Sequence, residues 1–273
     1  MATAIMTFYN EEYYLPWWIK HHSKLFDNGI LIDYHSTDRS YEICKDLCPP
    51  HWKIVKSMYD DFDPFTLDLE FQFYESTVSG FKMPLTTAEF LFVPAALDNI
   101  DRFCIDQKVD YFRTYGVCMV DTNTEELPTY DKQLYAQKYH GMINGYIGPP
   151  YNPLPNYFAC FFSRYYHNNT FGAYATGRHF LIPPLAPKFY KEYQALDIFT
   201  LKYKYSPWNP TTIARIQQFK DRIPQSALDD GKSGTHCLPE EAYISEYNHY
   251  LSTADDLRKD PIFLNAYNYC MSL

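Results

Sequence analysis

Two stretches near the start of the chain decide the fold: ATAIMTFYNEE at residues 2–12 and GILIDYHSTDRS at residues 29–40. Each opens with an apolar run of the length of a buried strand and closes with a polar cluster. The first cluster begins at Tyr9, and the second runs from Asp33 to Arg39. This pattern predicts two buried strands, each followed by a polar loop that can hold a ligand.

Helices are predicted after both strands. Residues 14–25 carry apolar side chains at helical spacing, and residues 40–47 form a second expected helix with N-cap residue types directly before it. A third strand is predicted at residues 52–57, after a Pro-Pro break. With right-handed crossovers, the order β-α-β-α-β gives a parallel sheet, and such sheets bind ligands at the carboxyl ends of their strands. Both polar clusters are therefore expected at one ligand-binding edge.

The rest of the chain is predicted to extend one α/β domain, because no repeat or low-complexity linker divides the 273 residues. A helix is expected over residues 63–80, and a buried strand within residues 82–93. Further strands are expected at residues 111–120, 157–162, 180–182 and 200–205, and amphipathic helices at residues 211–219 and 239–250.

The composition excludes several classes of function. A formal net charge of -9 does not suit a protein that coats nucleic acid, so no nucleic-acid partner is expected. The 7 cysteines include no CxxC pair, which favours reduced thiols in the cytoplasm. The chain lacks the basic start of a signal peptide and an apolar run of about 18 residues, so no transmembrane segment is expected. We expect a cytoplasmic protein that can work at a membrane surface.

The N-terminal stretches resemble the GT-A glycosyltransferases related to families 2 and 92. Members tend to begin with a strand that ends in Asn-Glu, here Asn10-Glu11, and a helix with a Trp-Ile-x-His-His segment, here Trp18–His22. Their second strand ends in Asp-x-x-Ser-Thr-Asp, here Asp33–Asp38. The resemblance covers residues 3–250 and is strongest over residues 3–40. It implies a GT-A fold, which is Rossmann-like α/β with a mostly parallel central sheet flanked by helices.

The same resemblance implies transfer of a sugar from a nucleoside diphosphate, with UDP as the expected carrier. The acceptor would be a hydroxyl of a glycan, glycoprotein or glycolipid, and the anomeric carbon would be inverted. Residues 1–95 would form the nucleotide-sugar half and residues 96–210 the acceptor half, while the helices of residues 211–273 would close the site. A carboxylate accepts hydrogen bonds from a uracil imide or ribose hydroxyls, so Asp33 is expected to hold one of these groups. The expected donor-binding residues are Thr7, Tyr9, Asn10, Glu11, Asp33, Ser36, Asp38, Thr87, Arg215, Lys220 and His236.

The metal motif of these enzymes is altered. Relatives often carry Leu-Asp-x-Asp-Glu-Phe near residue 86, where this chain has Leu85-Thr86-Thr87-Ala88-Glu89-Phe90. Glu89 is the one carboxylate left, whereas Mn²⁺ or Mg²⁺ prefers several oxygen ligands. Either the ion binds weakly through Glu89, diphosphate and water, or cationic side chains and helix N-termini stabilise the leaving group without it. The second interpretation is favoured. The nearby pair Asp68 and Glu70 is interpreted as a solvated helix face.

An inverting transferase needs a carboxylate that removes the proton of the acceptor hydroxyl. Asp121, directly after the predicted strand at residues 111–120, is the first choice, and Glu125 and Glu126 are the other candidates.

Basic residues near the C-terminus suit a diphosphate. Arg215, Lys220 and Arg222 follow a Pro-Trp-Asn-Pro turn, and His236 lies in a glycine-containing loop before a predicted helix. Gly177-Arg178-His179 ends another glycine-containing turn that resembles a feature of the group.

Two alternatives stay open. The missing Asp-x-Asp motif fits a degenerate, non-catalytic nucleotide-sugar-binding protein, and the early β-α-β pattern fits a nucleotidyltransferase or another Rossmann-like enzyme. The chain carries neither GxGxxG after its first strand, nor GxxxxGK[ST], nor GxSxG. Hydrolysis or transfer of a nucleotide sugar, tested with and without a chelator, separates a metal-independent transferase from the degenerate protein.

Overall fold

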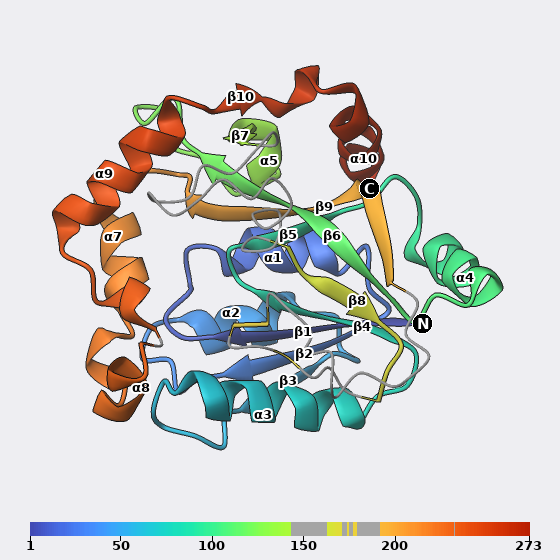
Figure 1. Ribbon diagram of the computed structural model, residues 1–273, viewed down its shortest axis with the longest axis horizontal. Coiled ribbons are helices and arrows are strands. Elements are labelled where there is room, and N and C mark those ends of the chain that lie inside the picture. The colour runs from blue at the N-terminus through green and yellow to red at the C-terminus, as the bar shows by residue number, and fades with distance from the viewer. Residues whose placement is uncertain (143–162, 171–173, 175–176, 179–191, 232) are drawn as a thin grey trace.

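The computed structural model describes residues 1–142, 163–170, 174, 177–178, 192–231 and 233–273. In this part of the chain, a mixed sheet of 10 strands is flanked by helices (Figure 1). The fold is therefore α/β, as predicted.

The N-terminal part of the sheet is parallel. β1 (Ala2–Phe8), β2 (Asn28–Asp33), β3 (Lys53–Lys56) and β4 (Phe81–Thr86) lie in the order β3-β2-β1-β4, and each neighbouring pair is parallel. The chain moves outward from β1 to β3 and then returns to place β4 on the other side of β1. Such a reversal leaves a crevice at the carboxyl ends of the strands. The predicted β-α-β-α-β start is confirmed.

Alternate side chains of β1 pack into opposite layers of the molecule. Ala4 and Met6 belong to the core that includes Trp18 of α1, whereas Ile5 packs with Phe71 of α3. Side chains of a strand alternate between its two faces, so apolar residues at successive positions of β1 require helices on both sides. The helices of this half are α1 (Leu15–His22), α2 (Ser40–Leu47) and α3 (Pro64–Ser76).

The second half of the chain makes the sheet mixed. β8 (Tyr165–His167) lies between β4 and β6 (Tyr111–Val120) and is antiparallel to both. β9 (Glu192–Tyr205) is parallel to β6 and antiparallel to β5 (Glu89–Phe92). The expected mostly parallel arrangement is therefore limited to the N-terminal part. The other described elements are β7 (His140–Met142), β10 (Asp255–Asp256), α4 (Leu97–Gln107), α5 (Leu134–Gln137), α7 (Pro210–Gln217), η2 (Lys220–Arg222), α8 (Gln225–Asp229), η3 (Gly234–His236), α9 (Glu240–Leu251), η4 (Leu257–Lys259) and α10 (Pro261–Ser272).

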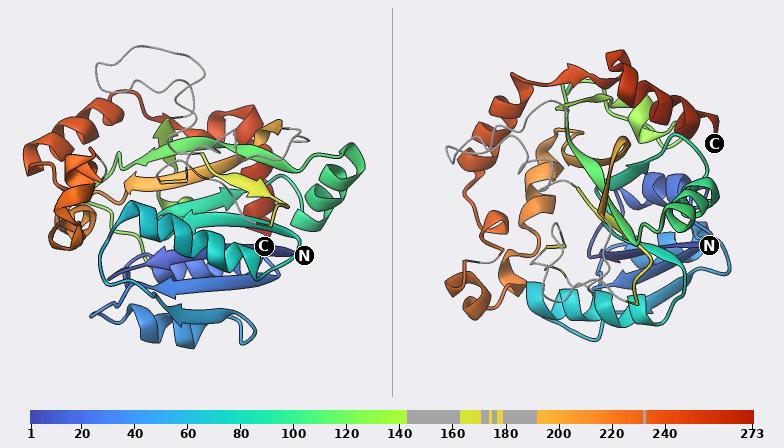
Figure 2. Two further views of the ribbon diagram at one scale, coloured as in Figure 1. Left: turned by 60° about the horizontal axis from the view of Figure 1, so that its bottom comes forward. Right: turned by 45° about the vertical axis from the view of Figure 1, so that its right-hand side comes forward.

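Three C-terminal helices stand at the carboxyl ends of the parallel strands. In Figure 1, β1 runs from the N-terminus at the right toward α7, α8 and α9 at the left, and both views of Figure 2 keep these helices along that side. The edge of the sheet at which a ligand is expected is thus bordered by a segment far along the chain.

Several predicted elements differ from the observed ones. The strand expected within residues 82–93 is two strands, β4 and β5, because Thr87 and Ala88 form a turn between them. The strand expected at residues 200–205 is the end of the longer β9. The strands expected at residues 157–162 and 180–182 lie outside the described residues. Among the helices that the structure describes, none combines the length and apolar character needed to cross a membrane.

Candidate functional site

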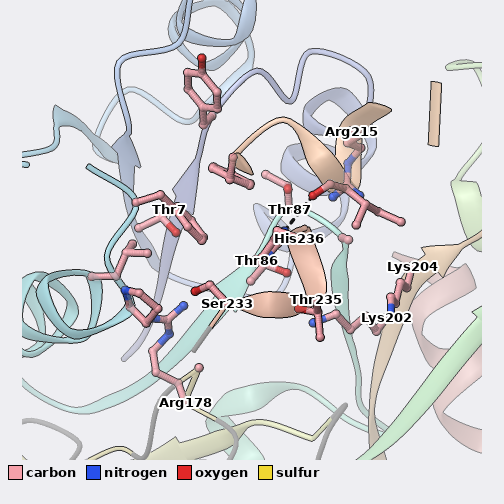
Figure 3. A pocket seen from close by; sticks show the side chains of 18 of the residues that line it. Thr7, Thr86, Thr87, Arg178, Lys202, Lys204, Arg215, Ser233, Thr235 and His236 are labelled. Atoms are coloured by element: carbon pink, nitrogen blue, oxygen red, sulfur yellow. Dashed lines mark hydrogen bonds between the residues drawn. The ribbon is translucent and has the colours of Figure 1, made fainter. Parts of the chain in front are cut away.

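A cavity of about 660 Å³ lies at the carboxyl ends of β1 and β4, where the strand order reverses (Figure 3). Residues Thr7–Tyr9 line it from β1 and the loop that follows, and residues Thr86–Ala88 line it from the end of β4. Open α/β sheets bind ligands at this kind of position. The edge at which the polar strand ends predicted a ligand is thus the edge that carries this cavity.

Helix α7 closes one side of the cavity, and its start is fixed by a capping box. Asn209 Oδ1 accepts a hydrogen bond from the backbone N–H of Thr211 at 3.0 Å, and the backbone N–H of Asn209 donates to Thr212 Oγ1 at 3.2 Å. One turn further on, Arg215 Nε donates to Glu11 Oε2 at 2.7 Å. This ion pair joins α7 to the loop after β1.

Cationic side chains dominate the polar lining of the cavity. Among the described residues, 5 lysines and arginines line it against 3 carboxylates, although the whole chain has a formal net charge of -9. Figure 3 labels four of these cations, with Lys202 and Lys204 side by side on β9 and Arg178 and Arg215 apart from them. The cations are Arg164, Arg178, Lys202, Lys204 and Arg215, and the carboxylates are Glu11, Asp68 and Glu246.

Each lining carboxylate has a cationic partner. Besides the Glu11 pair, Arg178 Nη1 contacts Asp68 Oδ1 at 2.5 Å, and Lys204 Nζ contacts Glu246 Oε2 at 3.0 Å. Burial raises the pKa of Glu11 and of Asp68, and the neighbouring guanidinium opposes the shift in each case. These pairs hold the cations at fixed positions around the cavity.

Glu89 is fully buried and does not line the cavity, and protein donors bind both of its carboxylate oxygens. Arg164 binds it with two donors, Nε to Oε2 at 2.7 Å and Nη2 to Oε1 at 2.6 Å. Lys202 Nζ donates to Oε1 at 3.0 Å, and the Thr86 amide donates to Oε2 at 2.9 Å. A carboxylate offers about four lone-pair sites, and four donors fill them here.

These residues do not fit a divalent metal ion. Every lone pair of Glu89 is engaged, two cations stand beside it, and burial lowers the pKa of Lys202 while the Glu89 charge raises it. Among the described residues, no group of three or more His, Cys, Asp or Glu side chains is arranged to hold a metal. The expected metal role of Glu89 is therefore corrected: Glu89 anchors Arg164 and Lys202.

Aromatic rings line the cavity near the ends of β1 and β2. Phe62 and Phe219 stack with ring centroids 4.0 Å apart, and Tyr9 lies 5.5 Å from Phe219. His236 meets both phenylalanines edge to face, and the Arg222 guanidinium lies 4.3 Å from the centroid of the Tyr9 ring. Flat apolar faces of this kind suit stacking with a planar ligand.

The two polar loops mainly bind each other. Asn10 Oδ1 accepts a hydrogen bond from the backbone N–H of Thr37 at 2.8 Å, and the backbone N–H of Asn10 donates to Ser36 Oγ at 3.1 Å. Asp33 Oδ1 accepts from the Ser36 amide at 2.8 Å, and Asp38 Oδ1 accepts from the Ser40 amide at 2.9 Å. These bonds fix the loops that carry the cavity residues.

The expected donor-binding residues thus fall into two groups. Six of them line the cavity: Thr7, Tyr9, Glu11, Thr87, Arg215 and His236. Five are not among its lining residues: Asn10, Asp33, Ser36, Asp38 and the exposed Lys220.

The expected bases lie elsewhere in the structure. Asp121 is 2% exposed and does not line the cavity; Lys138 Nζ and the Trp208 amide bind its two oxygens at 2.8 Å and 2.9 Å. Glu125 and Glu126 are exposed and also lie outside the lining. The structure thus brings none of the three to the cavity, and it gives Asp121 a place in a buried hydrogen-bond network.

Several cavity residues were missed by sequence reasoning. Lys202 and Lys204 occupy alternate positions of the predicted strand at residues 200–205, which puts them on one face, and this signal was available.

The interpretation of Asp68 and Glu70 as a solvated face is wrong, because both are buried. Glu70 accepts hydrogen bonds from Ser57 Oγ and the Met58 amide at 2.7 Å and 2.8 Å. α3 lies against the sheet, so these acids point toward partners on other elements.

Comparison of the sequence with models of known protein families gives no match, and comparison with curated proteins gives none either.

Proposed function

We propose that this chain is a GT-A-type glycosyltransferase and that its cavity binds a nucleotide sugar, with UDP as the expected carrier. The sugar moves to a hydroxyl of a glycan, glycoprotein or glycolipid with inversion, in the cytoplasm or at its membrane surface. The observation that carries the proposal is the cation-rich cavity at the point where the strand order reverses between β1 and β4. The resemblance of the N-terminal stretches supports the same class of donor.

The order of groups along the cavity supports a ligand with a base at one end and a diphosphate in the middle. Aromatic rings gather near Tyr9 and Tyr34, at the ends of β1 and β2. The ends of β4 and β9 follow across the sheet and carry Thr86, Lys202 and Lys204. A nucleotide sugar has this linear order of base, ribose, diphosphate and sugar.

The charges support a diphosphate held without a divalent ion. The diester diphosphate of a nucleotide sugar is a dianion, and the lining cations outnumber the carboxylates even when Glu89 is counted. Preorganised cations aimed at the leaving group can stabilise the charge that develops in the transition state. We propose that Lys202, Arg164 and Arg178 do this.

A thermal-shift panel of UDP-, GDP- and dTDP-sugars, each with Mn²⁺ and with EDTA, tests the proposal. A ligand present at 100 times its dissociation constant stabilises the native state by about 2.7 kcal/mol. We expect one nucleotide sugar to raise the melting temperature equally in both buffers, and we expect release of its nucleoside diphosphate when an acceptor is added. No shift with any nucleotide would overturn the proposal, and a shift confined to Mn²⁺ would overturn its metal-free part.

The engaged state of Asp121 also favours a second candidate, a nucleotide-sugar-binding protein without turnover. Binding of a nucleotide sugar with no release of the nucleoside diphosphate, for any acceptor class tried, would select this candidate.

A further inference from the structure

One carboxylate of the cavity differs from the others in its hydrogen bonding. Oε2 of Glu246 accepts from both Lys204 Nζ, at 3.0 Å, and the Tyr205 hydroxyl. Oε1 of Glu246 has no hydrogen-bond partner among the described residues. One oxygen of this carboxylate is thus held in place, while the other has no such partner in a side chain that lines the cavity.

The other two lining carboxylates are less accessible than Glu246. Both oxygens of Glu11 have hydrogen-bond partners, and the side chain of Asp68 is more deeply buried than that of Glu246. Glu11 Oε2 binds Arg215, and its Oε1 accepts from Gln218 Nε2 at 3.5 Å. Asp68 binds Arg178 and the backbone of Gly177. The Glu246 side chain is 30% exposed, against 5% for Glu11 and 10% for Asp68. Of these three acids, Glu246 is the one that an incoming molecule can reach.

The position of Glu246 matches the end of the ligand that reacts. The aromatic end of the cavity lies at β1 and β2, the cations of β9 follow, and Glu246 with Tyr250 lines the cavity from α9 beyond them. If the base of a nucleotide sugar stacks at the aromatic end, its sugar reaches the side where Glu246 lies.

On the basis of the proposed function, we propose that Glu246 is the catalytic base that accepts the proton of the acceptor hydroxyl. The hydroxyl oxygen forms a bond to the anomeric carbon while the proton passes to Glu246 Oε1. The bond between the anomeric carbon and the diphosphate oxygen breaks, and its electron pair leaves with the nucleoside diphosphate. The proton on Glu246 is then released to water. Lys204 and Tyr205 are positioning residues, because they hold Oε2.

The surroundings keep this carboxylate ionised at neutral pH. Burial opposes ionisation, but the Lys204 charge and the hydrogen bonds from Tyr205 and Lys204 lower the pKa of Glu246 overall. The titratable groups near it are Lys204 and Tyr205 of β9, Tyr243, His249 and Tyr250 of α9, and Cys118 of β6.

The test compares the Glu246→Gln and Glu246→Ala variants with Glu241→Gln, a matched control on the exposed face of the same helix. Using the nucleotide sugar that the thermal-shift panel selects, we expect Glu246→Gln to transfer at least ~100-fold more slowly than wild type. Its affinity for the nucleoside diphosphate should stay within about twofold of wild type, since the substitution disturbs the cations only through the ion pair with Lys204. The control should match wild type.

Azide separates a base from a structural residue. Azide is already an anion and needs no deprotonation, so it should restore cleavage of the donor by Glu246→Ala and yield a glycosyl azide of inverted configuration.

The positioning role of Tyr205 has its own readout. In Tyr205→Phe, the loss of the hydroxyl should raise the pKa of Glu246 and move the acid limb of the rate profile to higher pH.

The outcomes distinguish this inference from the proposed function. Wild-type turnover that persists in Glu246→Gln overturns the role of Glu246 alone. A Glu246→Ala variant that binds nucleotide but cleaves the donor neither with acceptor nor with azide also overturns it, and assigns a structural role. Absence of wild-type turnover overturns the proposed transferase and the inference with it.

Discussion

Replacing Glu89 by glutamine perturbs the centre of the site most sharply. The carboxylate is fully buried and accepts four hydrogen bonds, two from Arg164, one from Lys202 and one from the Thr86 amide. A glutamine keeps one carbonyl oxygen and turns an NH₂ group toward donors. Arg164, whose side chain is 2% exposed, then stays buried without a countercharge on that side. Removing one partner of a buried pair costs about 3–5 kcal/mol, and we expect a loss of that size in the free energy of unfolding.

Urea denaturation of wild type, Glu89→Gln and the exposed control Glu125→Gln measures this loss. For a two-state domain, the transition should move to lower urea with an unchanged slope, and the control should stay within about 0.5 kcal/mol. A second substitution, Lys202→Met in the Glu89→Gln background, removes one of the uncompensated cations and should restore part of the stability. Mn²⁺ should leave every melting temperature unchanged.

Two results would refute this reasoning. Glu89→Gln could prove as stable as wild type, which would mean that the carboxylate does not anchor the cations. Alternatively, Mn²⁺ could stabilise wild type and fail to stabilise Glu89→Gln, which would make Glu89 a metal ligand.

Three further predictions concern Asp121, Phe219 and His21. Asp121→Asn leaves the Lys138 ammonium buried without its partner, so it should lower the unfolding free energy by about 3 kcal/mol while folded molecules keep their transfer rate; inactive but fully stable protein would contradict this. Phe219→Ala should weaken uridine binding by about 1–3 kcal/mol in calorimetry, since it removes half of a stacking platform, and unchanged affinity would place the base elsewhere. Burial lowers the pKa of His21 from 6.5 to about 4, so the unfolded chain takes up the proton first and stability falls as pH drops through that window. This shift should lower the free energy of unfolding of wild type by about 3 kcal/mol between pH 7 and pH 4. Urea transitions should show that the difference in unfolding free energy between wild type and His21→Gln changes by this amount over the same range; a constant difference would contradict the shift.

The edge of the sheet that carries the cavity could be predicted, but most of the residues that use it could not. Polar clusters directly after two buried strands located the edge, because parallel strands bring their carboxyl ends together. The clusters themselves serve another purpose. Asn10 and His35 adopt left-handed backbone conformations, with φ of 51° and 60°, and side chains such as Ser36 tie the two loops together. A sequence pattern does not separate a residue that shapes a loop from one that faces the ligand.

The rest of the site depends on long-range pairs. Asp68 looked solvated because its partner Arg178 is 110 positions away, and Glu89 looked like a metal ligand because Arg164 is 75 positions away. Neither pairing has a local signal. Lys202 and Lys204 do have one, since they alternate on a predicted strand, but the direction of that face depends on β9 pairing with β5.

Some elements carry local signals that the periodicity of apolar residues does not show. α10 begins after Asp260, whose carboxylate accepts from the amides of Ile262 and Phe263, and Pro261 occupies its first turn. The division of residues 82–93 into β4 and β5 has no such signal, because the turn is made by Thr87 and Ala88, which are not typical turn residues.

Calorimetric titration of UDP and of uridine in the presence of EDTA tests the cation-lined diphosphate site most directly. Two charge-assisted hydrogen bonds to the diphosphate are worth about 3 kcal/mol in total, so UDP should bind at least ~100-fold more tightly than uridine. Lys202→Met, which leaves Glu89 paired with Arg164, should reduce that advantage about tenfold. Equal affinities for UDP and uridine, or UDP binding that appears only when Mn²⁺ replaces EDTA, would contradict the assignment.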